Sequence, residues 1–157
     1  MDALNREVLE YLEAERVAPP ETTSLWVIDG YSLATHPDLC DRLEELNTAA
    51  GEPAALAYRF GKPVLIAGNG VIVAFAGGTY VLCLRLPRDS VDPRLVGRRR
   101  EQPSKHELLR RKQEQLGALA SGDWTLLEPW PVDVPKGDGL PLLVNTLQRA
   151  VMRASLT

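Results

Sequence analysis

The densest group of side chains that could do chemistry is a basic segment, residues 94–112. Eight cations lie in it, and only Glu101 and Glu107 oppose them. Arginine forks bind phosphate and carboxylate through paired hydrogen bonds, and a cationic helix can follow a nucleic-acid backbone. The sequence therefore predicts an anion-binding or nucleic-acid-binding segment. Its candidate residues are Arg94, Arg98, Arg99, Arg100, Lys105, Arg110, Arg111 and Lys112.

The remaining charge pattern leaves other interpretations of this segment open. The whole chain has a net charge of −3 and a pI near 5.4, whereas a dedicated nucleic-acid-binding domain is usually basic. Aromatic residues, on which single-stranded bases stack, are absent from the segment. A solvated surface, self-association and another anionic partner therefore remain alternatives to nucleic acid.

Asp29 is the one residue that suggests metal-dependent catalysis. The run from Trp26 to Tyr31 is similar to the opening strand of NYN-type ribonucleases, in which a carboxylate after an apolar strand binds metal. Such a site needs further carboxylates at the ends of parallel strands, and the downstream sequence predicts hairpins instead. We interpret Asp29 as a turn residue before Gly30 and keep a metal-dependent nuclease or hydrolase as an alternative function.

The other reactive residue types form no catalytic signature. His36 and His106 each stand at a predicted helix start, and Cys40 and Cys83 lie among apolar residues, where reduced, buried thiols are expected. A strand follows the glycine-rich run 68–70, so this run predicts a hairpin and not a phosphate loop. The sequence thus predicts no catalytic residue, no metal site and no cofactor.

Aromatic residues near the predicted fifth strand offer a third alternative. Trp124, Trp130 and Tyr80 could line a small pocket, which would make the chain a small-ligand-binding domain. Such aromatics more often close the edge of a core.

Short apolar runs predict the sheet that positions these groups. Tight turns containing Asn-Gly and Gly-Gly separate the runs, and loops this short join only antiparallel neighbours. The four predicted strands of this meander are Ala55–Phe60, Pro63–Ala67, Val71–Phe75 and Thr79–Leu86, with a fifth at Trp124–Leu127. The predicted fold class is α+β, with a four- to five-stranded antiparallel meander packed with helices.

Helical periodicity and capping residues predict four helices around this sheet. They cover residues 2–16, residues from Pro37 to a stop near Gly51, residues 104–120 behind a Ser-Lys-His-Glu capping box, and residues 141–154. Residues 1–20 would form an N-terminal helix with a proline-containing connection, and residues 36–154 the core of a single domain.

The third and fourth strands are apolar at nearly every position, whereas an antiparallel sheet with one wet face should alternate. Helices would cover one face, and the remaining helices or a second subunit would cover the other. This pattern motivates a homodimer.

The order of elements resembles that of the TfoX N-terminal and MmcQ-YjbR-like families. Four features carry the resemblance: Arg59-Phe60-Gly61, the strand within 70–78, the basic residue in Leu84-Arg85-Leu86-Pro87, and the strand led by Trp124. It covers about residues 36–154. The resemblance implies links to competence regulation and DNA association, and it implies no common enzymatic activity.

Composition and the distribution of charge indicate the compartment and the kinds of partner. The acidic N-terminus lacks the pattern of a secretory signal, and no apolar run reaches the roughly 20 residues of a membrane helix. Residues 1–57 carry 12 acidic and 3 basic side chains, and residues 58–157 carry 9 and 15, which are net charges of −9 and +6. We therefore expect a cytoplasmic, non-enzymatic regulatory or interaction domain, without a membrane partner, whose partners are a second copy, another protein or nucleic acid.

Overall fold

The computed structural model describes residues 2–14, 26–28, 31–33, 35–77, 81–96 and 123–156. The helices among these residues are α1 (Asp2–Ala14), α2 (Pro37–Ala49) and α4 (Gly139–Ser155), with 3-10 turns η3 (Arg88–Ser90) and η4 (Pro93–Leu95). The strands are β1 (Trp26–Ile28), β2 (Tyr31–Leu33), β3 (Ala54–Arg59), β4 (Lys62–Ala67), β5 (Ile72–Gly77), β6 (Val81–Leu84) and β7 (Thr125–Leu126).

The main sheet is an antiparallel meander of five strands in the order β3-β4-β5-β6-β7, and β1 and β2 form a separate hairpin. The predicted α+β class and meander are confirmed. The strand β2 was not predicted, and the predicted helix over residues 104–120 lies outside the described residues.

The first hairpin turn differs from its predicted position by one residue. Phe60 and Gly61 both have positive φ angles, 55° and 78°, and Lys62, which was predicted to be part of the turn, begins β4 opposite Arg59. Two central residues with positive φ match the right-handed twist of the flanking strands, which is why two-residue hairpins favour this geometry.

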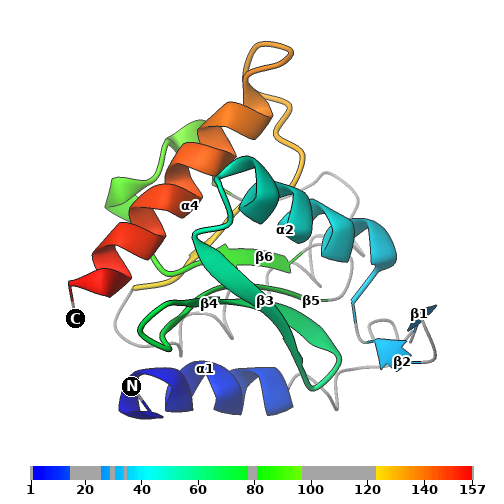
Figure 1. Ribbon diagram of the computed structural model, residues 1–157. Helices are drawn as coiled ribbons and strands as arrows, with labels where there is room; N and C mark the ends of the chain where they lie inside the picture. Colours follow the sequence, from blue (N-terminus) through cyan, green and yellow to red (C-terminus); the bar gives the residue numbers. More distant parts are fainter. Residues whose placement is uncertain are drawn as a thin grey trace.

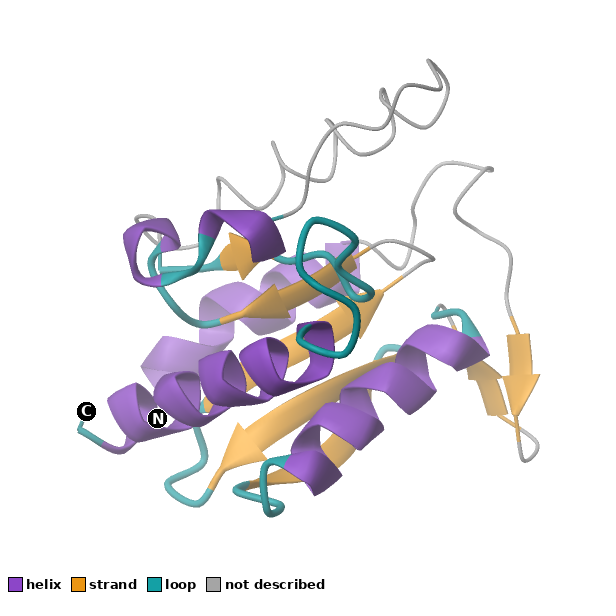
Figure 2. Ribbon diagram, turned by 90° about the horizontal axis from the view of Figure 1, so that it is seen from above, coloured by secondary structure: helices purple, strands orange, loops and turns teal. Residues whose placement is uncertain are grey.

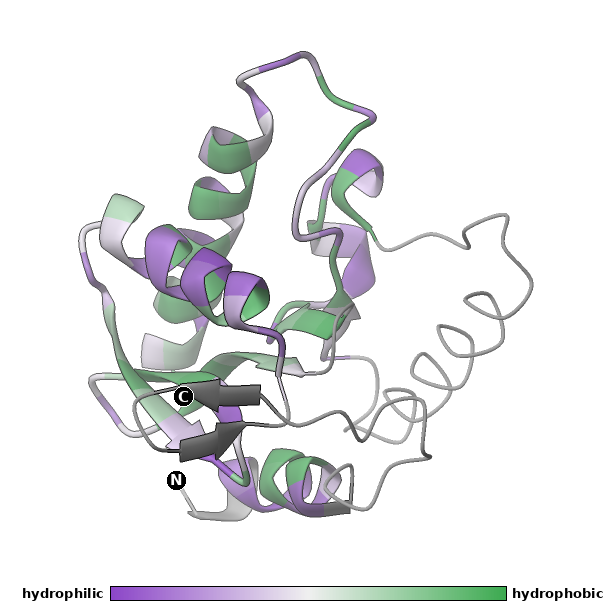
Figure 3. Cartoon of the chain, turned by 90° about the vertical axis from the view of Figure 1, so that its right-hand side faces the viewer, coloured by the Kyte–Doolittle hydropathy of each residue, from purple (hydrophilic) through white to green (hydrophobic). Residues whose placement is uncertain are grey.

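Helices cover both faces of the sheet (Figures 1 and 2). Helices α2 and α4 lie on one face, where Leu43 and Leu147 join the larger core cluster. Helix α1 lies on the other face, where Val8 and Leu12 pack with Phe75 in a second cluster. The strands of the main sheet are predominantly hydrophobic in Figure 3, whereas each helix carries both hydrophobic and hydrophilic residues.

This two-sided packing explains the uniformly apolar strands. Every residue of β5 and β6 is buried, one set of side chains under α2 and α4 and the other under α1. One chain therefore accounts for the pattern that motivated a homodimer.

The N-terminus of α2 forms as its sequence predicts. Pro37 occupies the first turn, and the Asp38 amide donates to Nδ1 of His36 at 3.0 Å. His36 is therefore the helix cap, and its imidazole is used for structure.

Candidate functional site

Arg94 is the only candidate anion-binding residue within the described part of the chain. It is exposed in η4, and its Nη2 lies 2.8 Å from Oδ2 of Asp92. The Asp92 carboxylate also accepts from the Arg94 amide at 2.9 Å. Hydrogen bonds from the Arg94 side chain and amide lower the pKa of Asp92 to about 2. The guanidinium of Arg94 is thus already paired within its own turn.

The other seven candidates fall outside the described residues: Arg98, Arg99, Arg100, Lys105, Arg110, Arg111 and Lys112. The described residues on either side of this stretch are fixed next to each other. Val96 forms a β-bridge with Leu127, and the Glu128 amide donates to the Leu95 carbonyl at 2.7 Å. Val96 and Asp123, the described residues on either side of this stretch, therefore both lie close to β7 at one edge of the sheet.

An open pocket of about 360 Å³ lies on the connection that leads to this point. Its lining residues are Arg88, Asp89, Val91, Pro93 and Val96. Arg149 of α4 donates to the Ser90 carbonyl and so ties this connection to the helix. One cation and one carboxylate line the pocket, so it shows no net preference for an anion.

The metal-dependent alternative finds no support in the described residues. Asp29 lies outside them, between β1 and β2, which pair antiparallel. All strand pairs of the described part are antiparallel, and no three His, Cys, Asp or Glu side chains described there could hold a metal ion.

The aromatic residues of the ligand-pocket alternative do not come together. Trp124 is buried in the α1-side cluster, with its ring 5.2 Å from that of Phe75. Trp130 is 49% exposed and lies 5.9 Å from the guanidinium of Arg42 on α2. The two indoles thus lie on opposite sides of the sheet, and Tyr80 falls outside the described residues.

Sequence reasoning missed two buried cations. The ammonium of Lys62 donates to the Leu12 carbonyl at the C-terminal end of α1, at 3.1 Å. The guanidinium of Arg85 lies 4.5 Å from the centre of the Trp124 ring, and its Nε donates to the Ile72 carbonyl at 2.7 Å. Burial lowers the pKa of Arg85, and nearby Asp123 opposes that shift. The signal that the sequence offered was a charged residue within an otherwise apolar run. For both Lys62 and Arg85, this residue makes a buried contact within the fold.

The two cysteines should be unreactive in the native protein. Cys40 is 3% exposed and Cys83 fully buried. Burial raises the pKa of Cys40 from 9.0 to about 11, and burial also raises the pKa of Cys83. Because the thiolate is the nucleophile, raising the pKa of Cys40 from 9.0 to about 11 leaves about a hundredfold less of its thiolate at pH 8.

We therefore expect 5,5′-dithiobis(2-nitrobenzoate) to label neither thiol of the native protein at pH 8 and both after unfolding in urea. Because burial raises the folded pKa of Cys40, we expect its protonated thiol to stabilise the fold below pH 9 and this contribution to disappear as the pH rises from 9 through 11. A Cys40→Ala variant should lose less stability over that interval. A fast-reacting native thiol would contradict the buried placement.

Comparison with known proteins gives no further guide: no family model, no curated protein and no solved structure matches the chain. None of the helices described is long and apolar enough to cross a membrane.

Proposed function

We propose that the chain is a non-enzymatic regulatory or interaction domain that contacts an anionic partner through the basic segment 94–112. Nucleic acid is the partner to test first. The observation that supports this proposal is charge density, eight cations against two acids within 19 residues. Since Asp92 already pairs with Arg94, the seven cations beyond Val96 carry the proposal. The resemblance to the TfoX and YjbR-like families, which implies an association with DNA, agrees with it.

The described flanks of the segment strengthen the proposal. Val96 is tied to Leu127, and Leu95 to Glu128, by main-chain bonds, so the segment starts from a fixed place on the fold. Cations that start from a fixed place lose less conformational entropy on binding than cations on a loose tail.

Salt dependence is the decisive test of this proposal. We expect the affinity for a fluorescein-labelled DNA duplex, measured by anisotropy, to fall steeply between about 50 and 200 mM salt. The plot of log affinity against log salt should have a slope of about −0.9 for each phosphate contacted. Replacing Arg98, Arg99 and Arg100 with glutamine should reduce the magnitude of this slope by about 3.

A matched control separates local contacts from net charge. Replacing the exposed Arg6, Arg59 and Lys136 with glutamine removes an equal number of positive charges, three, from other places on the described surface. This control should leave the slope close to that of the unmodified chain. A salt-independent affinity, or equal losses in the two triple variants, would overturn the nucleic-acid version.

A cytoplasmic homodimer belongs to the same proposal. Its support is the charge asymmetry, −9 over residues 1–57 against +6 over residues 58–157. Opposite charges on two copies attract each other, and salt screens this attraction over about 10 Å at 0.1 M. Light scattering should therefore show a dimer at low salt and a monomer at high salt. A monomer under both conditions would remove the dimer from the proposal.

A further inference from the structure

The two edges of the five-stranded sheet differ in how they are covered. The edge strand β7 is two residues long, and the bridge between Leu127 and Val96 continues its pairing. The edge strand β3 is six residues long and pairs with β4 at every position without a bulge. Within the described part of the chain, no strand pairs with the outer side of β3 (Figure 1).

Hydrogen bonds from α2 show which main-chain groups of β3 face outward. The Ala54 carbonyl accepts from Nδ2 of Asn47 at 2.8 Å, and the Ala54 amide donates to Oδ1 of Asn47 at 3.3 Å. The main-chain groups of Ala54 therefore face away from β4. Since the direction alternates along an antiparallel strand, those of Leu56 and Tyr58 also face outward.

Among the described residues, no group bonds the outward main-chain groups at the centre of β3. The Tyr58 carbonyl accepts from Nη1 of Arg59 at 2.9 Å, and Asn47 occupies both groups of Ala54. The amide and carbonyl of Leu56 and the amide of Tyr58 have no hydrogen bond to any described residue along this edge. Lysine, proline and bulges usually protect such an edge, and Arg59 at the end of β3 is its only charge.

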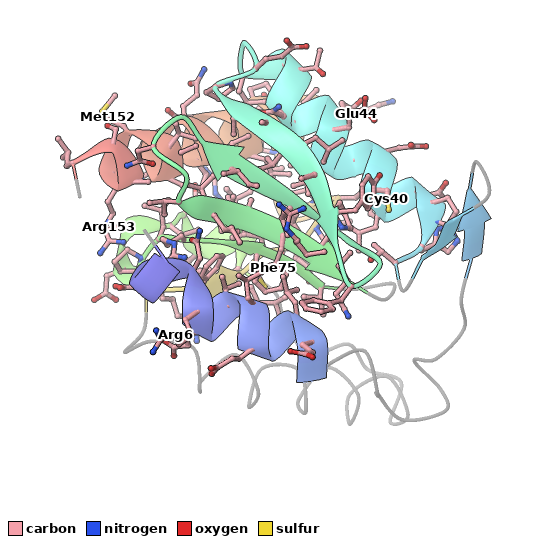
Figure 4. The ribbon with its side chains drawn as sticks, turned by 60° about the horizontal axis from the view of Figure 1, so that its bottom comes forward. Arg6, Cys40, Glu44, Phe75, Met152 and Arg153 are labelled. Atoms are coloured by element: carbon pink, nitrogen blue, oxygen red, sulfur yellow. The ribbon has the colours of Figure 1, made fainter. Side chains whose placement is uncertain are left out.

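The surroundings of this edge are acidic. Glu44 lies one helical turn before Asn47 on α2, and Asp41 one turn before Glu44. Both side chains are exposed, and Figure 4 shows Glu44 on α2 beside β3. The pKa of Tyr58 is raised, and burial is the largest cause. Cys40 raises it as well, and the carboxylates of Glu44 and Asp41 raise it further. Those carboxylates are therefore near enough to act on Tyr58.

We propose that β3 accepts an added strand from an extended, lysine- or arginine-bearing segment of another protein. The main chain of Leu56 and Tyr58 would supply the hydrogen bonds of strand addition, and Asp41 and Glu44 would select for cationic side chains. The strand β3 and the point where the basic segment leaves the described fold, at Val96 beside β7, lie at opposite edges of the sheet, and their charges are opposite. The proposal therefore does not rest on anion binding.

A second copy of the chain fits this edge less well. Antiparallel pairing of two β3 strands about Leu56 would place both α2 helices on the same face of the joined sheet. Asp41 and Glu44 of the two chains would then approach one another, and like charges across a seam oppose association. The charge of the edge thus favours a cationic partner over self-pairing.

Amide exchange in the full chain tests the proposal directly. The probe is an acetylated and amidated peptide of alternating lysine and valine. In the unliganded protein we expect the amides of Leu56 and Tyr58 to exchange rapidly and those of Ala55, Ala57 and Arg59, which face β4, slowly. The peptide should shift and protect the Leu56 and Tyr58 amides. Its glutamate–valine counterpart, and a lysine–valine peptide with alternate amides methylated, should not.

Two variants separate the charge contribution from the main-chain contribution. Asp41→Lys with Glu44→Lys should weaken peptide binding by about tenfold. Glu10→Lys with Glu13→Lys reverses two exposed acids at the same spacing on α1 and should leave binding unchanged. Leu56→Pro removes an amide outside the β3–β4 ladder and should abolish protection.

Three results would overturn the proposal. The methylated peptide could bind as well as the unmodified one, or both charge-reversal pairs could weaken binding equally. The Leu56 and Tyr58 amides could also be protected without peptide in a sample that sediments as a dimer, which would assign the edge to a second copy.

Discussion

Phe75→Ala should lower the free energy of unfolding by about 3–5 kcal/mol. Phe75 is fully buried, and its ring lies 5.5 Å from that of Tyr11 on α1 and 5.2 Å from that of Trp124. Val64 and Cys83 pair with it on the neighbouring strands. Phe75 therefore fills the centre of the layer between the sheet and α1 (Figure 4), and its removal leaves a cavity that rigid strands cannot close.

Urea denaturation monitored by circular dichroism measures this loss. Phe75→Leu keeps most of the volume and should lose about 1–1.5 kcal/mol, which separates the cavity from the change of side-chain type. The apparent melting temperature of Phe75→Ala should fall by roughly 10 °C. A loss below about 1 kcal/mol would mean that α1 adds little to the core, and the two-sided packing of β5 and β6 would then need another explanation.

The elements of the core could be predicted because their signals are local. The glycine-containing turns define the hairpins on each side of β4, and the stripe Leu39, Leu43 and Leu46 defines α2. Strand β2 was missed because its three residues, Tyr31–Leu33, are too few to establish a period. The face covered by α1 could not be predicted either, since amphipathic periodicity shows that a helix has a buried side and does not show what buries it.

The candidate site was harder to predict for a related reason. Charge density singles out residues 94–112, but the Arg94–Asp92 pair depends on the 3-10 turn that places the two side chains together. The sequence carries no signal for the edge of β3 that no described strand covers. The pairing of β3 with β4 sets which main-chain groups of β3 face outward, and the hydrogen bonds from Asn47 show it. The sequence presents Asn47 only as a polar residue near the end of a helix.

A bulge in the sheet explains the structural role of Arg85. Sequence patterns could not show this role either. Leu65 pairs with Ala74 but Ile66 pairs with Ile72, so β5 has one extra residue at this bulge. Side chains then bond the main chain of Ile72. Its amide donates to Oδ1 of Asn5 at 2.9 Å, and its carbonyl accepts from Nε of Arg85 at 2.7 Å.

Arg85→Met should therefore lower the free energy of unfolding by about 2–4 kcal/mol. The Ile72 carbonyl would lose a buried hydrogen bond, which costs about 1–3 kcal/mol, and Trp124 would lose a stacked cation worth about 1 kcal/mol. Because methionine fills a similar volume, the lost free energy of unfolding measures the contribution of the guanidinium and not the cost of a cavity. Arg85→Lys keeps the charge without the planar fork and should lose about half as much.

Arg153 provides the control for this prediction. It is also an arginine, and it pairs with Asp123 at 3.2 Å, but both side chains are about 40% exposed. Arg153→Met should cost less than about 1 kcal/mol, because exposed ion pairs contribute little. Equal losses in Arg85→Met and Arg153→Met would show that the charge network around Asp123 stabilises the fold. A loss confined to Arg85→Met, and insensitive to salt, would show that the hydrogen bond to the bulged strand does so.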